Sequence, residues 1–203
     1  RDGASPASGD HACAPDAQQP LEAALLKHFG HTSFRDGQRH VIEAVLRGRD
    51  ALVVWPTDRG KSLTYQLPAV LTNKLVVVIE PNISLMDNQV AELNAQAKAV
   101  GHAKAWATQL HSADARNESA ARAGDFPLVF ISPQRATSPR FKQYLVHWHT
   151  QGKLLLVAVD EAHCISESDN YFRPEYRELG GLRQVVPGVP FIALTATAAP
   201  HVR

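Results

Sequence analysis

The chain has 203 residues, of which 44% are hydrophobic, a formal net charge of +1 and a pI of about 8.0. Its length and apolar content suffice for one sizeable domain with a buried core, which excludes a chain that is disordered throughout. The small net charge excludes nucleic-acid binding through bulk positive charge, so any DNA contact has to come from a local patch or from backbone donors.

The first twenty residues are rich in Ala, Ser, Pro, Gly and Asp, which is typical of a flexible tail. We therefore expect the folded domain to span residues 21–203. Apolar residues at helical spacing predict a short helix from Leu21 that ends at Gly30. They also predict a second helix over Gln38 to Arg47.

Short runs rich in Val, Ile and Leu follow, nearly continuous rather than alternating, as expected for strands buried on both faces. They are Ala51 to Trp55, Leu75 to Ile79, Leu128 to Ile131, Leu154 to Val159 and Phe191 to Leu194, with a weaker candidate at Ala103 to Ala107. The predicted helices between them are Ser62 to Leu71, Ile83 to Ala97, Asp114 to Arg122 and Pro139 to His149. This alternation indicates an α/β fold with a doubly wound, mostly parallel sheet, whose ligand site lies at the carboxyl ends of the strands.

A candidate phosphate-binding loop follows the first predicted strand and leads into a predicted helix. Gly60, Lys61 and Ser62 match the end of the pattern G-x-x-x-x-G-K-[ST], and Trp55 stands at its first glycine. In such a loop, backbone N–H groups surround the phosphates, the lysine meets the β- and γ-phosphates, and the serine hydroxyl holds Mg²⁺. The motif taken alone leaves open a chance Gly-Lys-Ser in a loop.

Two carboxylates, Asp160 and Glu161, follow an apolar strand, where charge is costly unless it has a function. Beside a phosphate loop, Asp160 can hold Mg²⁺ through water, and Glu161 can orient or deprotonate the attacking water. His163 can link the nucleotide site to a neighbouring element. The alternative is a solvated strand end with a helix-capping aspartate, and the combination with the Gly-Lys-Ser motif favours the catalytic interpretation.

Seven sequence blocks support a wider comparison. They are Phe34-Arg35-Asp36-Gly37-Gln38, Pro56-Thr57 with Gly60-Lys61-Ser62, Tyr65-Gln66-Leu67-Pro68-Ala69, Ile83-Ser84-Leu85-Met86, Asp160-Glu161-Ala162-His163-Cys164-Ile165-Ser166, Phe172-Arg173-Pro174-Glu175-Tyr176, and Ala193-Leu194-Thr195-Ala196-Thr197-Ala198. In order and spacing they resemble the RecQ helicases of superfamily 2, over about Leu21 to Arg203. The resemblance implies the first RecA-like, P-loop NTPase lobe of an ATP-dependent 3′-to-5′ DNA helicase that acts in DNA repair and recombination.

The resemblance also implies roles for residues of the nucleotide site. Arg35 and Gln38 fall in the family's adenine-recognition motif, where the glutamine amide reads the adenine edge. Thr57 joins Gly60, Lys61 and Ser62 in the phosphate loop, with ATP and Mg²⁺ as cofactors. The carboxylates of the acidic motif serve Mg²⁺ and hydrolysis. Outside the family context, Gln38 would be interpreted as a polar residue on a helix surface.

Further implied roles concern DNA and coupling. Phe172 and Arg173 fall in the family's aromatic-rich loop, which links DNA binding to hydrolysis. Thr195 and Thr197 fall in the motif that couples the ATP state to DNA and to the second lobe, although alone they would read as a turn at a strand end. The implied partners are single-stranded or forked DNA and a second RecA-like lobe.

Several positions depart from the family pattern. Asp58 and Arg59 stand where glycines are usual, so we expect ATP binding to be weakened or lost, because glycine permits φ > 0 and Asp58 adds negative charge beside an anion. In the loop 167–171 the stacking Trp is missing, and stacking on a base is worth roughly 1–3 kcal/mol. Substitution of this Trp by Tyr171 or Phe172 is the alternative. Asn82 and Asp87 stand where Leu and Lys are common. These changes predict impaired coupling between DNA and hydrolysis.

The chain ends just past Thr197, before the second lobe, the zinc-binding region and the winged helix that the resemblance implies. We therefore expect that it does not unwind DNA alone. Two alternatives are a degenerate helicase lobe that binds DNA or protein without turnover, and an unrelated P-loop kinase or ATPase. The acidic motif together with Thr195 and Thr197 argues against the latter.

The cellular location follows from what the sequence lacks. The two cysteines, Cys13 and Cys164, lie far apart and are expected to be thiols in a reducing compartment. Neither a membrane span nor a secretory signal is visible. We expect an intracellular protein, nuclear if eukaryotic and cytoplasmic if bacterial. The missing initiator Met is consistent with a fragment or a processed product.

Overall fold

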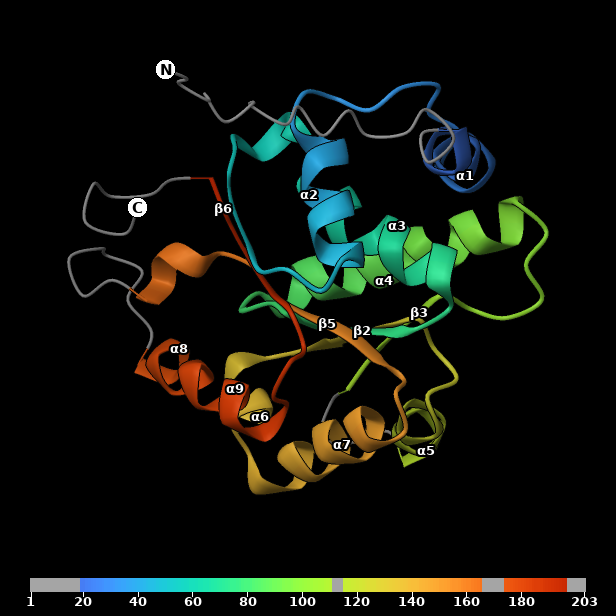
Figure 1. The fold of residues 1–203 in the computed structure, drawn as a ribbon. Helices are drawn as coiled ribbons and strands as arrows, with labels where there is room; N and C mark the ends of the chain where they lie inside the picture. Colours follow the sequence, from blue (N-terminus) through green and yellow to red (C-terminus); the bar gives the residue numbers. More distant parts are fainter. Residues whose placement is uncertain (1–18, 111–114, 166–173, 197–203) are drawn as a thin grey trace, which may run out of the picture.

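The computed structural model describes residues 19–110, 115–165 and 174–196, which form a six-stranded sheet with helices on both faces (Figure 1). The strand order is β1-β6-β5-β2-β4-β3, and every pair is parallel. The strands are β1 (Ala51–Val54), β2 (Leu75–Ile79), β3 (Ala107–Gln109), β4 (Leu128–Ile131), β5 (Leu154–Val159) and β6 (Phe191–Thr195). The predicted doubly wound α/β fold is confirmed, and within the described residues the sheet is entirely parallel.

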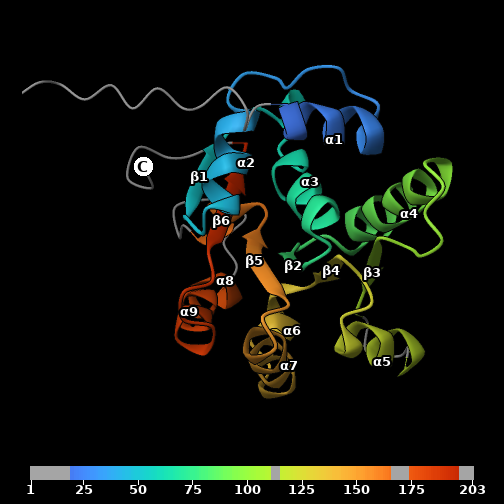
Figure 2. The same ribbon diagram turned by 45° about the vertical axis from the view of Figure 1, so that its right-hand side comes forward.

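The helices divide between the two faces of the sheet, as Figures 1 and 2 show. One face carries α1 (Gln19–Phe29), α2 (Gln38–Leu46), α3 (Leu63–Thr72) and α4 (Ile83–Ala99). The other carries α5 (Ala115–Ala123), α6 (Pro133–Ala136), α7 (Pro139–Thr150), α8 (Pro174–Glu178) and α9 (Leu182–Val185). Short 3₁₀ turns are η2 (Thr57–Arg59), η3 (Ala162–Ile165) and η4 (Leu179–Gly181). None of the helices in the described ranges combines the length and apolarity that crossing a bilayer requires.

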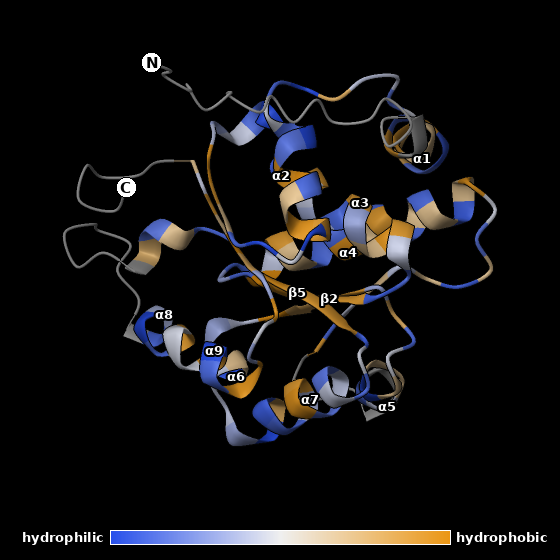
Figure 3. Cartoon of the chain, viewed as in Figure 1, coloured by the Kyte–Doolittle hydropathy of each residue, from blue (hydrophilic) through white to orange (hydrophobic). Residues whose placement is uncertain are grey.

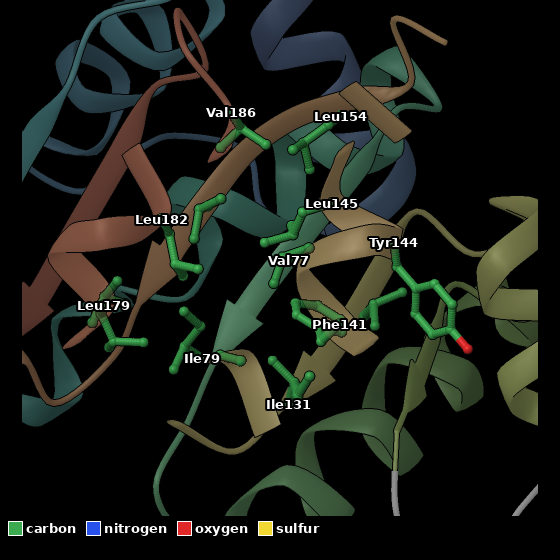
Figure 4. Packing of buried hydrophobic residues seen from close by; sticks show 14 of the residues in the cluster. Val77, Ile79, Ile131, Phe141, Tyr144, Leu145, Leu154, Leu179, Leu182 and Val186 are labelled. Atoms are coloured by element: carbon green, nitrogen blue, oxygen red, sulfur yellow. The ribbon is translucent and has the colours of Figure 1, made fainter. Parts of the chain in front are cut away.

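The central strand β2 shows how the sheet separates two cores. Val76 and Val78 belong to the cluster under α2, α3 and α4, whereas Val77 and Ile79 belong to the cluster on the other face. Figure 4 shows Val77 and Ile79 among side chains of the second cluster, and the apolar strands appear in orange in Figure 3. All four residues are fully buried, and each such side chain stabilises the fold by roughly 1.5–3 kcal/mol.

The weak strand expected at Ala103 to Ala107 is wrong, because β3 begins at Ala107 and continues to Gln109. The side chains of 103–105 are exposed, whereas Trp106 is buried. The apolar signal at the start of the expected strand came from alanines, which indicate little about burial. The short helices α6, α8 and α9 were not predicted, since each is shorter than two helical turns.

Candidate nucleotide-binding site

Three adjacent strands bring the motifs together. β1 pairs with β6 through Val54 and Thr195, and β6 pairs with β5 through Ala193 and Val159. Because the strands are parallel, their carboxyl ends lie at one edge of the sheet. The phosphate loop after β1, the acidic motif after β5 and the end of β6 therefore meet there.

In the phosphate loop, the lysine side chain donates hydrogen bonds to carbonyl groups of the loop itself. Gly60 adopts a left-handed conformation with φ 72°, which favours glycine, and a Cβ there would lie 2.7 Å from Gln38 Nε2 and displace that amide. Lys61 is buried, and its Nζ donates to the carbonyl oxygens of Trp55 at 3.0 Å and Pro56 at 3.3 Å. An incoming phosphate would compete with these two carbonyls for the ammonium group.

The two departures in the loop do not strain its backbone. Asp58 and Arg59 lie in the 3₁₀ turn η2, and the non-glycine residues with positive φ in the described ranges are Asn73 and Glu161. The conformational freedom of glycine is thus not needed at positions 58 and 59 in this structure, because Gly60 supplies the left-handed turn. Both side chains are exposed, so what they change is charge and shape at the mouth of the loop.

A pocket beside the loop has the size of a small-molecule site, about 520 Å³ against roughly 300–1,000 Å³ for such sites. Its lining combines the segment after α1, the start of α2 and the phosphate loop: Gly30, His31, Thr32, Ser33, Arg35, Gln38, Thr57, Asp58, Gly60 and Leu63. Arg35, Gln38, Thr57 and Gly60, all predicted to hold ATP, therefore share one pocket.

Gln38 links the adenine-recognition motif to the phosphate loop. Its amide nitrogen donates to the carbonyl oxygens of Gly60 at 3.0 Å and Arg59 at 3.4 Å, and its amide oxygen accepts from Arg35 N at 2.8 Å. The Arg35 guanidinium donates to the Asp58 carbonyl. The amide that was expected to read an adenine edge is thus bonded to the protein itself in this structure.

Asp160 is a buried carboxyl with a perturbed pKa. Burial is the largest cause that raises its pKa to about 6, and the neighbouring Glu161 charge adds to it. The hydrogen bond from Glu161 N at 2.9 Å and the charges of Lys61 and His163 act in the opposite direction. Tyr176 on α8 donates its hydroxyl to the Asp160 carbonyl at 2.9 Å, although sequence reasoning assigned it no role.

His163 connects the ends of β5 and β6. Its Nδ1 lies 3.0 Å from Thr195 Oγ1 and 3.2 Å from Glu161 Oε2. Glu161 itself has φ 49°, an uncommon conformation for a residue with a side chain. The arrangement places an imidazole between the candidate water-orienting carboxylate and the threonine at the end of β6.

A second pocket of about 400 Å³ adjoins the acidic motif, lined by Glu80, Pro81, Asn82, Leu85, Glu161, His163 and Cys164. Of the departures from the family pattern, Asn82 lines this pocket and Asp87 lies further along α4, and both have structural partners. The Asn82 side chain accepts from Leu85 N at 3.3 Å and caps α4. Asp87 accepts a hydrogen bond from Gln109 at the end of β3.

The donor set fits Mg²⁺. Ser62 and Asp160 offer hydroxyl and carboxylate oxygens, which this cation prefers. Burial raises the pKa of the Asp160 carboxyl, and a bound cation would favour its charged form.

Tyr65 is a further residue that sequence reasoning left without a role. It is fully buried, and its hydroxyl donates to Gln89 Oε1 on α4 at 2.8 Å. Burial chiefly raises its pKa well above the usual range, the nearby Asp160 charge adds to this, and a hydrogen bond with Ser62 opposes it. The sequence feature that could have identified Tyr65 is its position as a tyrosine within the apolar start of the helix that follows the phosphate loop.

Three predicted residues, Phe172, Arg173 and Thr197, lie outside the described residues, as does the loop 167–171. The structure brings together the other predicted site residues around the two strand-end motifs: Arg35, Gln38, Thr57, Gly60, Lys61, Ser62, Asp160, Glu161, His163 and Thr195.

Comparison with known proteins gives a consistent set of relatives. The family model described as DEAD/DEAH box helicase matches residues 35–203. The chain is 41% identical over 182 residues to the ATP-dependent DNA helicase RecQ of Haemophilus influenzae, covering 89% of this chain and 28% of that protein. It is 37% identical to the probable ATP-dependent DNA helicase RecS of Bacillus subtilis, covering 88% of this chain and 34% of that protein. The chain thus spans about a third or less of these two relatives.

Solved structures share the fold. The DUF1998 helicase MrfA superposes with a TM-score of 0.68 at 23% identity, covering 88% of this chain and 29% of that one. An ATP-dependent RNA helicase from Sulfolobus tokodaii, described as hypothetical, gives 0.63 at 17% identity, covering 90% and 52%. At such identities the likeness concerns the fold alone.

Proposed function

Since the chain belongs to the DEAD/DEAH box helicase family, whose members use ATP, we propose that it is the ATP-binding lobe of a RecQ-type DNA helicase. One observation carries the proposal. A phosphate loop, a pair of carboxylates and a pocket of nucleotide size lie at the carboxyl ends of three adjacent parallel strands. Parallel α/β sheets bind their ligands at this edge.

In this proposal the base of ATP enters the pocket beside Arg35 and Gln38, and its phosphates lie over the loop at the start of α3. Backbone N–H groups there favour an anion. Lys61 exchanges the carbonyls of Trp55 and Pro56 for phosphate oxygens. Without a base, the Gln38 amide keeps its contact with the loop backbone. With a base present, the amide moves away from the loop backbone toward the adenine edge.

Mg²⁺ would be held by Ser62 and, through water, by Asp160, and when bound it balances the charge of the phosphates. Burial raises the pKa of Asp160 to about 6, and a cation at this carboxylate would favour its charged form and lower that pKa. Glu161 orients and deprotonates the attacking water. His163 connects this carboxylate to Thr195, so a shift at the nucleotide is transmitted to the end of β6.

The DNA part of the proposal rests on the relatives. The curated relatives are named DNA helicases, and MrfA has been solved with DNA. We propose that single-stranded or forked DNA and a second RecA-like lobe are the partners, with Phe172, Arg173, Thr195 and Thr197 as coupling residues. Movement on DNA in the 3′-to-5′ direction requires the assembled two-lobe motor. This motor acts in the cellular compartment that contains the DNA.

Binding of a fluorescent ATP analogue with Mg²⁺ tests the nucleotide site. Wild-type chain is expected to bind, and Lys61→Ala to bind at least tenfold more weakly, because a charged hydrogen bond to phosphate is lost. Exposed Lys98→Ala on α4 is the matched control, and it should bind like wild type. If the nucleotide binds neither wild type nor variant, also in the presence of a second lobe, the proposal fails.

A second candidate is a helicase-like module that binds DNA or protein without turnover. The exposed Asp58 carboxylate at the mouth of the phosphate pocket favours it. Hydrolysis separates the two candidates. Single-turnover ATP cleavage in a two-lobe protein, lost in Glu161→Gln, supports the motor, whereas ATP binding without cleavage in wild type supports the module.

A further inference from the structure

The peptide group that joins Asp160 to Glu161 is hydrogen-bonded at both of its polar ends. Its carbonyl oxygen accepts from the Tyr176 hydroxyl at 2.9 Å, and its N–H donates to Asp160 Oδ1, also at 2.9 Å. On the strand side, Asp160 N donates to the Ile79 carbonyl of β2 at 2.9 Å. The orientation of this peptide group therefore involves a side chain from α8, an element outside the acidic motif.

Glu161 has a backbone conformation that its side chain disfavours. Its φ is 49°, in the left-handed region, where a Cβ is crowded by the backbone. A rotation of the Asp160–Glu161 peptide changes this φ and would relieve the crowding. Such conformations persist only where the surroundings hold them. The cost of a left-handed residue and the contribution of one hydrogen bond are of the same order, so a single bond can decide the orientation of the peptide.

Rotation would also change the group that the Asp160 carboxylate faces. In the observed orientation, the carboxylate accepts a hydrogen bond from Glu161 N. If the peptide were reversed, its carbonyl oxygen would face the carboxylate instead, and the two negatively polarised oxygens would repel each other. The observed orientation thus holds the carboxylate of a candidate Mg²⁺ ligand in place.

Resting on the proposed function, we propose that Tyr176 is a positioning residue for the two carboxylates. Its hydroxyl holds the Asp160–Glu161 peptide in the orientation that turns an N–H toward the Asp160 carboxylate and keeps Glu161 in the left-handed region. Tyr176 acts through the Asp160 carbonyl, and its role requires no contact with the nucleotide or with Mg²⁺.

The hydroxyl and the ring of Tyr176 have separate surroundings. The residue is 1% exposed, and it belongs to the apolar cluster that includes Ala162, Cys164 and Leu179, where phenylalanine would fill the same space. A buried hydroxyl is costly unless it is bonded, and this one reaches the carbonyl that directly follows β5. Tyr176→Phe therefore removes the bond to the peptide and retains the packing.

The first experiment detects the backbone conformation through stability and needs no nucleotide. Glycine adopts a positive φ readily and alanine does not, so urea unfolding of Glu161→Gly is compared with that of Glu161→Ala in the full chain. With Tyr176 present, the folding equilibrium constant of the glycine variant should exceed that of the alanine variant roughly twofold to tenfold. In a Tyr176→Phe background the peptide can rotate, and the difference should vanish or change sign, because glycine loses more conformational entropy on folding.

The second experiment measures the metal dependence of nucleotide binding by the full chain. Its readout is the ratio of dissociation constants for a fluorescent non-hydrolysable ATP analogue in EDTA and in Mg²⁺. Tyr176→Phe should lower this ratio roughly threefold to tenfold, the range of one net hydrogen bond, because the Asp160 carboxylate is no longer held for the cation. Affinity in EDTA should change little, since the phosphate loop is untouched.

Two further variants complete the test. Tyr144→Phe removes another buried tyrosine hydroxyl, one that donates to Glu118 on α5, and should leave both readouts unchanged. Tyr176→Met also lacks the hydroxyl and fills the space with a flexible apolar side chain. It should give the same results as Tyr176→Phe, even if that variant fails to fold.

The outcomes are distinct. If the glycine variant keeps its advantage over the alanine variant without the Tyr176 hydroxyl, other contacts hold the peptide and the positioning role is overturned. An equal loss of affinity in EDTA and in Mg²⁺ would likewise leave Tyr176 as a core residue. Absence of nucleotide binding by wild type would instead overturn the proposed function, and the stability comparison would still decide whether Tyr176 holds the peptide.

Discussion

Asp160 illustrates a cost that a site imposes on the fold. Asp160 is 7% exposed and directly follows β5, and burial raises the pKa of its carboxyl to about 6 from an ordinary value of about 3.8. A raised folded-state pKa means that the native protein holds this proton more tightly than the unfolded chain does. The contribution of Asp160 to stability is therefore most favourable below pH 4 and is lost as pH rises through about 6.

Asp160→Asn is thus expected to stabilise the protein in the absence of metal. At pH 8 the free energy of unfolding should rise by roughly 1–3 kcal/mol, the order of a shift of about two pKa units, and the gain should vanish near pH 4. Urea unfolding at both pH values measures it. Asp125→Asn, at an exposed position, is the control. A gain that is the same at both pH values would contradict the assignment to a buried carboxyl.

Asp58 is expected to weaken ATP binding through its charge rather than through its backbone conformation. Because η2 accommodates it without positive φ, Asp58→Asn should restore most of the affinity that Asp58→Gly restores. Removing one exposed like charge near the phosphates should tighten binding roughly twofold to tenfold at low salt. Titrations of a fluorescent ATP analogue at two salt concentrations measure this. If only the glycine variant binds more tightly, backbone freedom is the cause after all.

At the scale of elements, Asn94 joins α4 to the edge strand β3. Its amide donates to the Ala107 carbonyl and accepts from the Ala107 N–H, both at 2.9 Å, so it takes the place of a neighbouring strand. Ala107 is buried, and water would not replace these two bonds.

Asn94→Ala is therefore expected to reduce the free energy of unfolding by roughly 2–3 kcal/mol, because a buried backbone N–H and C=O lose their partners. Asn88→Ala on an exposed position of the same helix should change it by less than about 0.5 kcal/mol. Urea unfolding of the two variants and wild type provides the comparison. Equal effects at both positions would mean that helix propensity, and not the bond to β3, is measured.

For the whole molecule, we propose that the folded unit begins with α1 at Gln19, two residues before the predicted boundary at residue 21, and that a tail precedes it. Deleting residues 1–18 should leave the free energy of unfolding unchanged within about 0.5 kcal/mol. Deleting residues 1–29 removes α1, whose buried Leu21 and Leu25 pack against α2 and α3. That deletion should cost roughly 3–6 kcal/mol and weaken nucleotide binding, because the next segment lines the pocket. A large loss from the shorter deletion would contradict the proposed boundary.

The sequence by itself determined the fold class, and it predicted the candidate site residues. Continuous apolar runs, as in β2 and β5, indicate burial on both faces. Asp160-Glu161 follows β5 directly, and Gly60-Lys61-Ser62 follows β1 after the turn η2. These signals are local, since burial, turn chemistry and helix starts depend on residues a few positions apart. Locality also explains the errors, because the alanine-rich start of the expected strand at 103–107 indicates little about burial.

Only the tertiary structure decided which side chains meet. The strand order places β6 between β1 and β5, which brings Thr195 within 3.0 Å of His163 across 32 residues of sequence. The same holds for Gln38 at the phosphate loop and for Tyr65 with Gln89 on another helix. Such contacts depend on packing and register across the whole sheet, so no spacing within the sequence reports them. The sequence therefore indicated the parts of a nucleotide site, and the fold determined how they are connected.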